Sequence, residues 1–218
     1  MSTMNAANAR VPQSVIRRLT KYLTHLQALR ARGIEWVSSQ ELADNLGLTS
    51  STVRQDLSHI DFSGISRRGY QTEGLCSVLS GVLGADTVWN IVVVGAGNLG
   101  KALALHEEFH RRGFHICGVF DSDPRKIGRK IGRLTIQSMR TLPAAVRDSK
   151  IDMGVVAVPA RSAQGVADIL IASGIRGLLN MAQTHVVAPR HVPVVDVRIV
   201  ATLQELAHAV SQTKRPVP

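Results

Sequence analysis

The feature that most constrains the fold is a glycine-rich turn between a buried strand and a helix. The run Trp89–Val94 predicts the strand, and the helix is expected over residues 98–111. In the spacing G-x-G-x-x-G, the first glycine allows a tight turn, the second lets the backbone approach a pyrophosphate, and the third lets helix and strand pack closely. This order indicates a parallel α/β domain that binds a dinucleotide rather than a structural turn alone. The turn consists of Gly95, Ala96, Gly97, Asn98, Leu99 and Gly100.

An acid at the end of the next expected strand indicates which dinucleotide binds. That strand covers residues 115–120, and Asp121 follows it, 21 residues past Gly100, where a ribose-binding carboxylate belongs. The carboxylate favours NAD(H), because it would repel the 2′-phosphate of NADP(H). Five basic residues come next and either accept a 2′-phosphate or face solvent: Arg125, Lys126, Arg129, Lys130 and Arg133.

The later part of the chain continues the alternation of strands and helices. Strands are expected over residues 153–158 and 176–180, with a helix over residues 162–173 between them. Ligands of doubly wound sheets bind at the carboxyl ends of the strands. The residues at these ends are expected to surround the nicotinamide half of the cofactor: Val158, Pro159, Asn180, Met181 and Ala182.

The first part of the chain has a helical pattern instead, and the glycine-rich stretch Leu79–Ala85 is the expected boundary. A long helix is expected over residues 12–32. Ser38 and Glu41 match a capping box that starts a short helix over residues 39–46. A turn at Gly47 and a third helix over residues 50–60 complete a helix-turn-helix pattern. A helical pair with no DNA-binding role is the alternative.

The third helix and the segment after it carry the candidate DNA contacts. Hydroxyls at a helix start suit phosphates, whereas arginine and glutamine can reach base edges. The glycine-bracketed arginines after the helix resemble a wing that could enter a minor groove. A solvated helix face and a plain basic hairpin are the alternatives. The candidates are Ser39, Ser50, Ser51, Thr52, Arg54, Gln55, Ser58, His59, Arg67 and Arg68.

The charge supports a polyanionic partner without locating it. The chain has 26 Lys and Arg against 16 acidic residues, a formal net charge of +10. The basic excess is spread over the whole length, and aromatics make up only 4%, which disfavours a base-stacking platform. With two cysteines, no long apolar run and no secretory signal pattern, we expect a cytoplasmic protein that does not enter a membrane.

One further motif matches a zinc-protease signature literally. His106 to His110 reads H-E-x-x-H, but it lies in the helix that leaves the glycine turn, and no third ligand is evident nearby. We therefore expect two surface histidines there and no metal.

Together these elements resemble the Rex family of redox-sensing transcriptional repressors, from about Val11 to Val210. The fold class is then α/β: a winged helix-turn-helix domain over residues 11–80, a Rossmann-like doubly wound parallel sheet over residues 85–200, and a C-terminal helix over residues 201–212. Residues 1–10 are expected to be disordered. The resemblance rests on residues 53–58 (VRQDLS), 69–70 (GY), 94–100 (VGAGNLG), 120–124 (FDSDP), 158–159 (VP), 179–182 (LNMA) and 195–196 (VD).

The resemblance implies a mechanism. It implies a homodimer that binds palindromic operator DNA, with the C-terminal helix swapped onto the partner's Rossmann domain. It also implies that NADH closes the dimer and releases the DNA, whereas NAD⁺ permits binding, and it assigns Tyr70 and Asp196 to the switch. For the C-terminal helix, packing within its own chain is the alternative.

Three departures from the family pattern affect these expectations. Gln55 stands where a lysine is usual, the wing arginine is displaced by one position, and Val197 is smaller than the usual apolar residue after Asp196. The first two concern the operator sequence, and the third concerns the response to NADH.

Two other classes of function are compatible with a Rossmann domain. An NAD-dependent dehydrogenase with a helical extension would need an acid–base group, and His185 and His191 are the candidates near the late strands. A module that binds coenzyme A or a nucleotide without switching is the third possibility.

Overall fold

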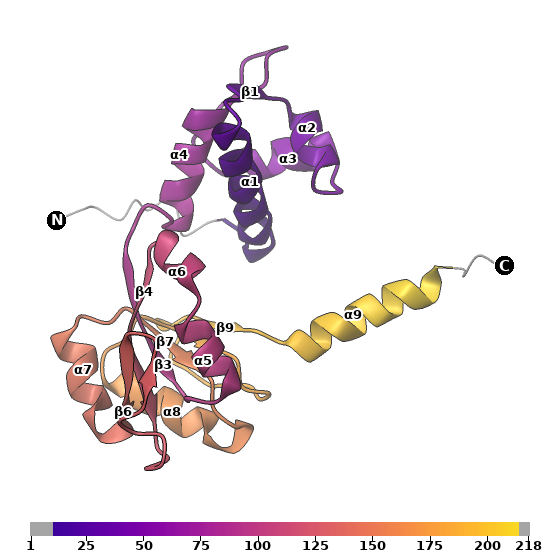
Figure 1. Cartoon of the computed structure of the whole chain (residues 1–218). Coiled ribbons are helices and arrows are strands. Elements are labelled where there is room, and N and C mark those ends of the chain that lie inside the picture. Colours follow the sequence, from indigo (N-terminus) through magenta and orange to yellow (C-terminus); the bar gives the residue numbers. More distant parts are fainter. Residues whose placement is uncertain (1–10, 214–218) are drawn as a thin grey trace. The chain divides into compact units, whose positions relative to one another are not determined.

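The computed structural model describes residues 11–213, which divide into two compact units, residues up to Thr87 and residues from Val88 (Figure 1). The prediction of disorder for residues 1–10 lies outside the described residues. No helix of residues 11–213 is long and apolar enough to cross a membrane.

The first unit is a helical bundle with one short antiparallel strand pair. The strands are joined at Trp36↔Gln71 and Val37↔Tyr70. Its elements are α1 (Gln13–Ala31), β1 (Trp36–Val37), α2 (Ser39–Asp44), α3 (Ser50–Leu57), β2 (Tyr70–Gln71) and α4 (Thr72–Leu83).

The expected caps and turn of the helix-turn-helix are present. The backbone N–H of Ser38 donates to Glu41 Oε2 at 2.6 Å, and the N–H of Glu41 donates to Ser38 Oγ at 3.1 Å, which completes the capping box. Thr49 Oγ1 accepts the N–H of Thr52 at 3.1 Å and starts α3. Gly47, between the two helices, has a φ of +64°, a conformation that glycine adopts without strain.

The core of the first unit joins α1 to the helix-turn-helix and to α4, which the sequence pattern did not predict. Leu19, Leu42 and Val53 are fully buried, and Leu75 and Leu79 of α4 join them. The expected boundary, Leu79–Ala85, lies just before the division between Thr87 and Val88. Its first five residues complete α4, because they pack against α1, and Gly84 ends this helix in the left-handed conformation.

The second unit has a seven-stranded sheet in its described residues, in the order β5-β6-β4-β3-β7-β8-β9. All neighbours are parallel except β5 and β6. Without β5, the order is that of a Rossmann fold, and it reverses between β3 and β7. The strands are β3 (Trp89–Val94), β4 (Phe114–Asp121), β5 (Lys130–Ile131), β6 (Leu134–Ser138), β7 (Met153–Val156), β8 (Gly177–Asn180) and β9 (Val194–Asp196).

Helices cover the two faces of this sheet unequally. On one face, α7 (Leu142–Asp148) and α8 (Ala160–Ala172) pack on alternate strand residues such as Val92 and Val156. On the other face, α5 (Asn98–Ala104) packs near β3 and β4, where Leu103 meets the cluster around Val93. The single helix expected over residues 98–111 is interrupted, because His106 has an extended ψ of 101° and starts α6 (Glu107–Arg111).

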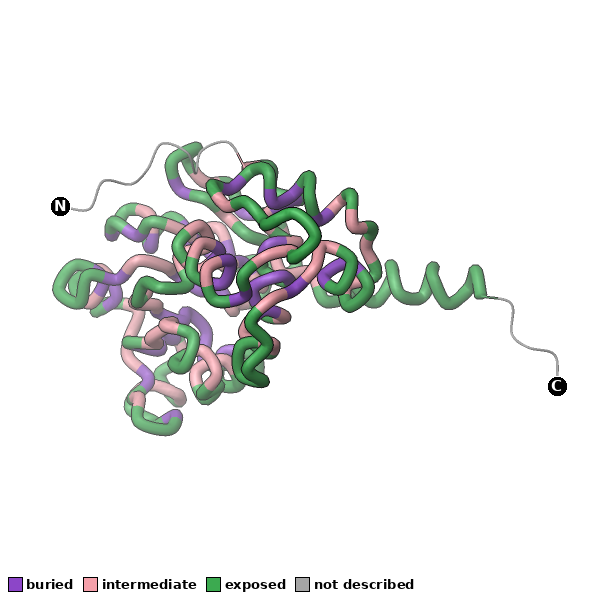
Figure 2. The backbone as a smooth tube through the Cα atoms, turned by 90° about the horizontal axis from the view of Figure 1, so that it is seen from above, coloured by how far each residue is buried: buried purple, intermediate pink, exposed green. Residues whose placement is uncertain are grey.

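The last helix, α9 (Ile199–Gln212), has no buried residue. Figure 2 shows it as an exposed stretch throughout. Its apolar side chains repeat at helical spacing and are half exposed or more: Ile199, Leu203, Leu206 and Val210.

Candidate functional site

The glycine turn lies where the strand order reverses, between the ends of β3 and β7. Gly95 has a φ of +107°, and a Cβ there would overlap the carbonyl of Ala157 just after β7. A Cβ on Gly100 would overlap the carbonyl of Gly95. Around Gly97, by contrast, a Cβ would meet nothing within 4 Å. Gly95 and Gly100 therefore serve close packing, whereas Gly97 leaves open space beside the backbone, as a pyrophosphate requires.

The exposed side of the turn is formed by Gly97, Asn98 and Leu99, whereas Ala96 is buried. This division follows from the chain path, since β3 ends in the core and α5 begins at the surface. The open backbone of Gly97 thus lies on the accessible side of the turn, at the carboxyl end of β3.

Asp121 ends β4 and is tied to the turn. Its Oδ2 accepts the N–H of Ala96 at 2.8 Å and a hydrogen bond from Lys126 Nζ at 2.9 Å, and its Oδ1 accepts the N–H of Asp123 at 2.8 Å. Burial raises the pKa of the Asp121 carboxyl, but these bonds outweigh burial and lower the pKa overall. The carboxylate is therefore charged at neutral pH and fixed beside the turn.

Sequence reasoning left open what the basic residues after Asp121 do. Lys126 is paired with Asp121, and Arg125 is paired with Asp123 at 3.0 Å. The other three, Arg129, Lys130 and Arg133, are exposed. The Lys126 ammonium offsets part of the negative charge of Asp121.

The expected nicotinamide side is built at the carboxyl ends of β7, β8 and β9. Asn180 is fully buried, and its Nδ2 donates to Asp196 Oδ1 at 2.7 Å and to the carbonyl of Thr184 at 2.8 Å. Asn180 Oδ1 accepts the N–H of Ala182 at 3.1 Å. Val158 and Met181 are half-buried, and Pro159 is the N-cap residue of α8.

The predicted DNA-contacting residues share the exposed side of the helix-turn-helix. Arg54 reaches back to α2, where its Nη1 donates to Ser39 Oγ at 3.0 Å. Thr52 is half-buried, and its hydroxyl is 2.8 Å from that of Thr49. The remaining candidates lie on α3 or within two residues of its end, half-buried in the case of Ser50 and exposed for the others: Ser51, Gln55, Ser58 and His59.

A buried ion pair that the sequence pattern did not single out holds α3 against α1. Asp56 is 2% exposed and accepts two hydrogen bonds from Arg18, at 2.6 and 2.7 Å, and one from the Tyr22 hydroxyl at 2.7 Å. Burial raises the pKa of Asp56, but these bonds outweigh it and lower the pKa. Asp56 lies three positions after Val53 and directly before Leu57, so it falls on the buried stripe of α3. This spacing is the sequence signal that could have indicated a buried acid.

The wing is a short hairpin whose two arginines have different surroundings. Ile65 and Gly69 bridge its base, with backbone bonds of 2.7 and 2.9 Å. Arg68 lies over the ring of Trp36, 3.9 Å from its centroid, so it is held against β1. Arg67 is exposed and has a φ of +63°, a left-handed conformation that costs a non-glycine residue about 1 kcal/mol or more.

This difference leads to a prediction. Arg67→Gly removes the backbone strain and the charge together, so the free energy of unfolding should stay within about 1 kcal/mol of wild type. Affinity for duplex DNA should fall, and the slope of log K against log salt should decrease by about one phosphate contact. Thermal unfolding and DNA titrations at several salt concentrations measure both. Unchanged DNA affinity would assign the wing contact to another residue.

Tyr70 and Asp196, the two residues that the family resemblance assigns to the switch, lie in different units. Tyr70 lies on β2 with its ring centroid 6.5 Å from that of Phe62, and burial raises the pKa of its hydroxyl. Asp196 ends β9 and contacts Asn180, as described above. The role of both residues remains a prediction.

The H-E-x-x-H motif does not form a metal site in the described residues. Among residues 11–213, no group of three or more His, Cys, Asp or Glu side chains is placed to hold a metal ion. His106 packs on Phe109, and His110 packs on His115 with ring centroids 4.4 Å apart.

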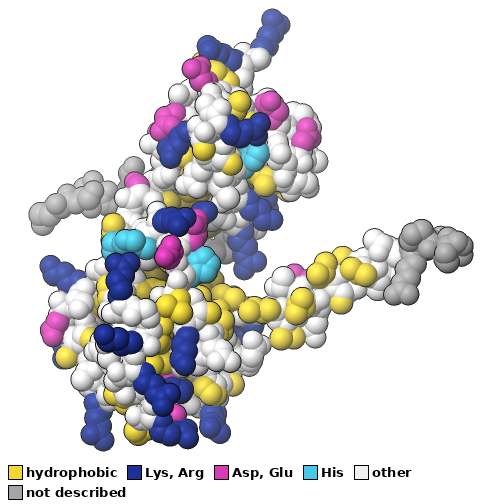
Figure 3. All heavy atoms as spheres, viewed as in Figure 1, with side chains coloured by type: hydrophobic (Ala, Val, Ile, Leu, Met, Phe, Trp, Pro, Cys, Tyr) yellow, Lys and Arg dark blue, Asp and Glu magenta, His cyan; other side chains and the backbone are white. Residues whose placement is uncertain are grey.

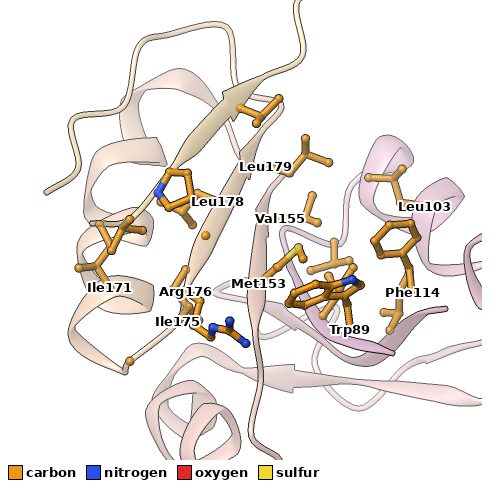
Figure 4. A pocket seen from close by; sticks show the side chains of 18 of the residues that line it. Trp89, Leu103, Phe114, Met153, Val155, Ile171, Ile175, Arg176, Leu178 and Leu179 are labelled. Atoms are coloured by element: carbon orange, nitrogen blue, oxygen red, sulfur yellow. The ribbon is translucent and has the colours of Figure 1, made fainter. Parts of the chain in front are cut away.

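A large apolar groove opens on the sheet face that α5 covers only in part. It has a volume of about 860 Å³ and is lined from five neighbouring strands, β4-β3-β7-β8-β9. Figure 4 shows Trp89, Met153, Val155 and Leu179 around it. Parallel sheets are normally covered on both faces. The groove is therefore a place where a covering element is missing from the described chain.

Comparisons with known proteins agree with this division into a DNA-binding unit and a nucleotide-binding unit. Residues 10–58 match the family model described as "Putative DNA-binding protein N-terminus", and residues 86–184 match "CoA binding domain". The chain is 40% identical to the redox-sensing transcriptional repressor Rex of Carboxydothermus hydrogenoformans, over 90% of this chain and 95% of the relative. It is 37% identical to that of Thermosipho africanus, over 93% and 97%.

Solved structures give the same answer. The crystal structure of RSP in complex with NAD⁺ and operator DNA matches with a TM-score of 0.88 and 33% identity, over 93% of each chain. The complex of RSP with NADH matches with a TM-score of 0.85 at the same identity, over 93% of this chain and 95% of that chain.

The fold and the site define a two-domain transcriptional regulator, with a winged helix-turn-helix ahead of a Rossmann-type dinucleotide site. The chain belongs to the Rex family of redox-sensing transcriptional repressors. The predicted family and fold class are thus confirmed.

Proposed function

We propose that this protein represses transcription by binding palindromic operator DNA as a homodimer, and that NADH binding releases it. The observation that carries the proposal is the presence, in one chain, of a helix-turn-helix with an exposed polar helix and a glycine turn left open beside a charged Asp121. The relatives are named redox-sensing repressors, and RSP binds NADH in one crystal structure and NAD⁺ with operator DNA in another. A repressor of this kind acts in the cytoplasm.

The glycine turn and Asp121 are proposed to hold the adenosine half of the cofactor. A buried, charged carboxylate can accept ribose hydroxyls and disfavours a 2′-phosphate, so NAD(H) remains the preferred dinucleotide. The residues proposed to bind it are Gly95, Ala96, Gly97, Asn98, Leu99, Gly100, Asp121, Val158, Pro159, Asn180, Met181 and Ala182.

Two unpartnered surfaces support the homodimer. The groove on the sheet is apolar and open, and α9 presents an apolar stripe that none of residues 11–213 covers (Figure 3). Leu203 and Leu206 are 59% and 58% exposed, which is costly for side chains of this size. We propose that α9 of each protomer fills the groove of the other, a closed two-fold exchange.

The dimer explains how a small ligand could control DNA binding. Two helix-turn-helix units must lie about 34–36 Å apart, or a multiple of this, to contact successive major grooves. A ligand that prefers one arrangement of the dimer changes this spacing and weakens DNA binding. Because such coupling is reciprocal, operator DNA must weaken NADH binding by the same factor.

The proposal assigns no catalytic role to the site. His185 is largely exposed, and its Nδ1 is 3.8 Å from Asp196 Oδ2, too long for a hydrogen bond that would orient a general base. Incubation of NADH with small 2-oxo acids, followed at 340 nm, tests this point, and steady oxidation of NADH would contradict it.

Operator retention tests the whole proposal. A library of palindromic duplexes is retained by the protein alone, with NAD⁺ and with NADH, at one fixed salt concentration. We expect retention without nucleotide and with NAD⁺, and a loss of about tenfold or more in DNA affinity with NADH. Coenzyme A serves as a control ligand, because residues 86–184 match a model of that name. Equal retention with both nucleotides would refute the sensor.

The variant Asp121→Ala separates NADH binding from operator binding. The variant loses the carboxylate that Ala96, Asp123 and Lys126 surround, so NADH should bind at least about tenfold more weakly while operator affinity without nucleotide stays within about twofold. Fluorescence titration with NADH measures the first quantity. An unchanged titration would show that another acid binds the ribose.

A further inference from the structure

One guanidinium joins three segments at the carboxyl ends of β8 and β9. Arg198 Nη1 donates to the carbonyl of Ala182 at 3.1 Å, and its Nη2 donates to the carbonyl of Thr184 at 2.8 Å. The same Nη2 lies 3.3 Å from Asp196 Oδ2. Arg198 is also the residue directly before α9.

These contacts close a cycle that includes the expected nicotinamide side. Asp196 accepts from Asn180, Asn180 accepts the N–H of Ala182, and the carbonyl of Ala182 accepts from Arg198. The backbone N–H of Val197 adds a bond to the carbonyl of Asn180 at 2.8 Å. These hydrogen bonds therefore link four segments: the end of β8, the loop after it, the end of β9 and the start of α9.

The cycle is shielded enough for its charges to matter. The side chains of Arg198 and Asp196 are 29% and 32% exposed. Burial raises the pKa of Asp196, but the bonds from Asn180 and Arg198 outweigh burial and lower it overall. His185 also approaches Asp196, yet it is 77% exposed. Arg198 is thus the principal cation of the cluster.

The residue at the N-cap of α9 is Arg198 itself, and among the described residues no side chain caps the first turn of this helix. Since no residue of α9 is buried, the direction in which the helix leaves the sheet depends on the segment Asp196–Arg198. A movement of the loop after β8 would reach that segment through the guanidinium.

We propose that Arg198 is a positioning residue that couples the nicotinamide side of the dinucleotide site to the direction of α9. The inference rests on the proposed function, in which α9 docks on the second protomer. The planar guanidinium bonds two carbonyls and a carboxylate at once, whereas lysine keeps the charge without this fixed fork. Arg198 should therefore govern how strongly nucleotide binding affects DNA binding, not how tightly either ligand binds alone.

The experiment measures that coupling directly. Operator affinity is determined without nucleotide and at saturating NADH, and the ratio of the two dissociation constants is the coupling factor. For Arg198→Lys we expect this factor to fall by about fivefold or more, with operator affinity without nucleotide within about twofold of wild type. Arg190→Lys, at an exposed arginine of the loop between β8 and β9, is the matched control and should keep the wild-type factor.

The outcomes separate the two proposals. If NADH does not release wild-type protein from DNA, the proposed function is overturned, and this inference falls with it. If wild type is released and Arg198→Lys has the same coupling factor, the role of Arg198 alone is refuted. Thermal unfolding checks that the variant is folded. If it is not, Asp196→Asn, which removes the charge at the other end of the pair, must lower the coupling factor, and an unchanged factor refutes the role.

Discussion

Replacing Arg18 by methionine is expected to lower the free energy of unfolding of the first unit by about 3–5 kcal/mol. Methionine keeps most of the apolar stem of the arginine and removes both bonds to Asp56. Asp56 is 2% exposed, so its carboxylate would remain buried without a countercharge. Urea denaturation followed by circular dichroism measures the loss.

Two matched variants isolate the cause. Arg17→Met, at the exposed neighbouring position of α1, should change the free energy of unfolding by less than about 0.5 kcal/mol. The double variant Arg18→Met/Asp56→Asn removes both charges, keeps an oxygen that can accept the Tyr22 hydroxyl, and should recover most of the loss. If the double variant is as unstable as the single one, lost packing and not the buried charge is responsible.

The loss of unfolding free energy caused by Arg18→Met should also become smaller as the pH falls. Because the folded-state pKa of Asp56 is lowered, the ion pair stabilises the wild type above the unfolded pKa of about 3.9, and this contribution is lost as pH falls through the folded pKa. Protonation of Asp56 also removes the unpaired charge from Arg18→Met. The difference between the two proteins should therefore shrink in acid.

A charge on the apolar stripe of α9 is the second large perturbation. Leu206→Asp is expected to weaken the dimer by at least about 100-fold. Burying one leucine contributes about 1.5–3 kcal/mol, and a two-fold exchange places the change in both copies, for about 3–6 kcal/mol in total. Each 1.4 kcal/mol is tenfold in the dissociation constant. Sedimentation velocity over a range of protein concentrations measures this constant.

The control lies on the opposite side of the same helix. Gln204→Asp adds the same charge about 160° away around α9 and should leave the dimer intact. Loss of the dimer should also abolish tight operator binding, because one helix-turn-helix contacts one half-site only. A Leu206→Asp protein that still sediments as wild type would rule out the exchange of α9.

The features predicted well from sequence are those whose cause is local. The strand Trp89–Val94 was predicted with its observed bounds, and the cap at Ser38 and the turn at Gly47 were also correct. In each case a side chain or glycine acts on backbone within a few residues. Helix α4 was missed because what holds it is packing against α1, a distant segment.

In the candidate site, too, the features with a local cause were predicted and those that depend on distant contacts were not. The spacing from Gly100 indicated Asp121, and the structure places this acid beside Ala96 of the turn. Its pairing with Lys126 and the bonds of Arg198 could not be read from spacing, because each depends on how a loop folds back on a strand end. The break between α5 and α6 was also missed, and nothing in the local sequence explains why His106 is extended.

The margins of the sheet limit how copies of this chain can associate. On one side the last strand, β5, has two residues and turns back antiparallel at Lys130–Ile131; on the other, β9 has three. Short, charged or reversed margins discourage the addition of a foreign strand. The sheet therefore does not readily grow sideways into a continuous intermolecular sheet. The proposed exchange of α9 uses the open face of the sheet instead, and a two-fold exchange of this kind would close after two copies and would not extend into a fibre.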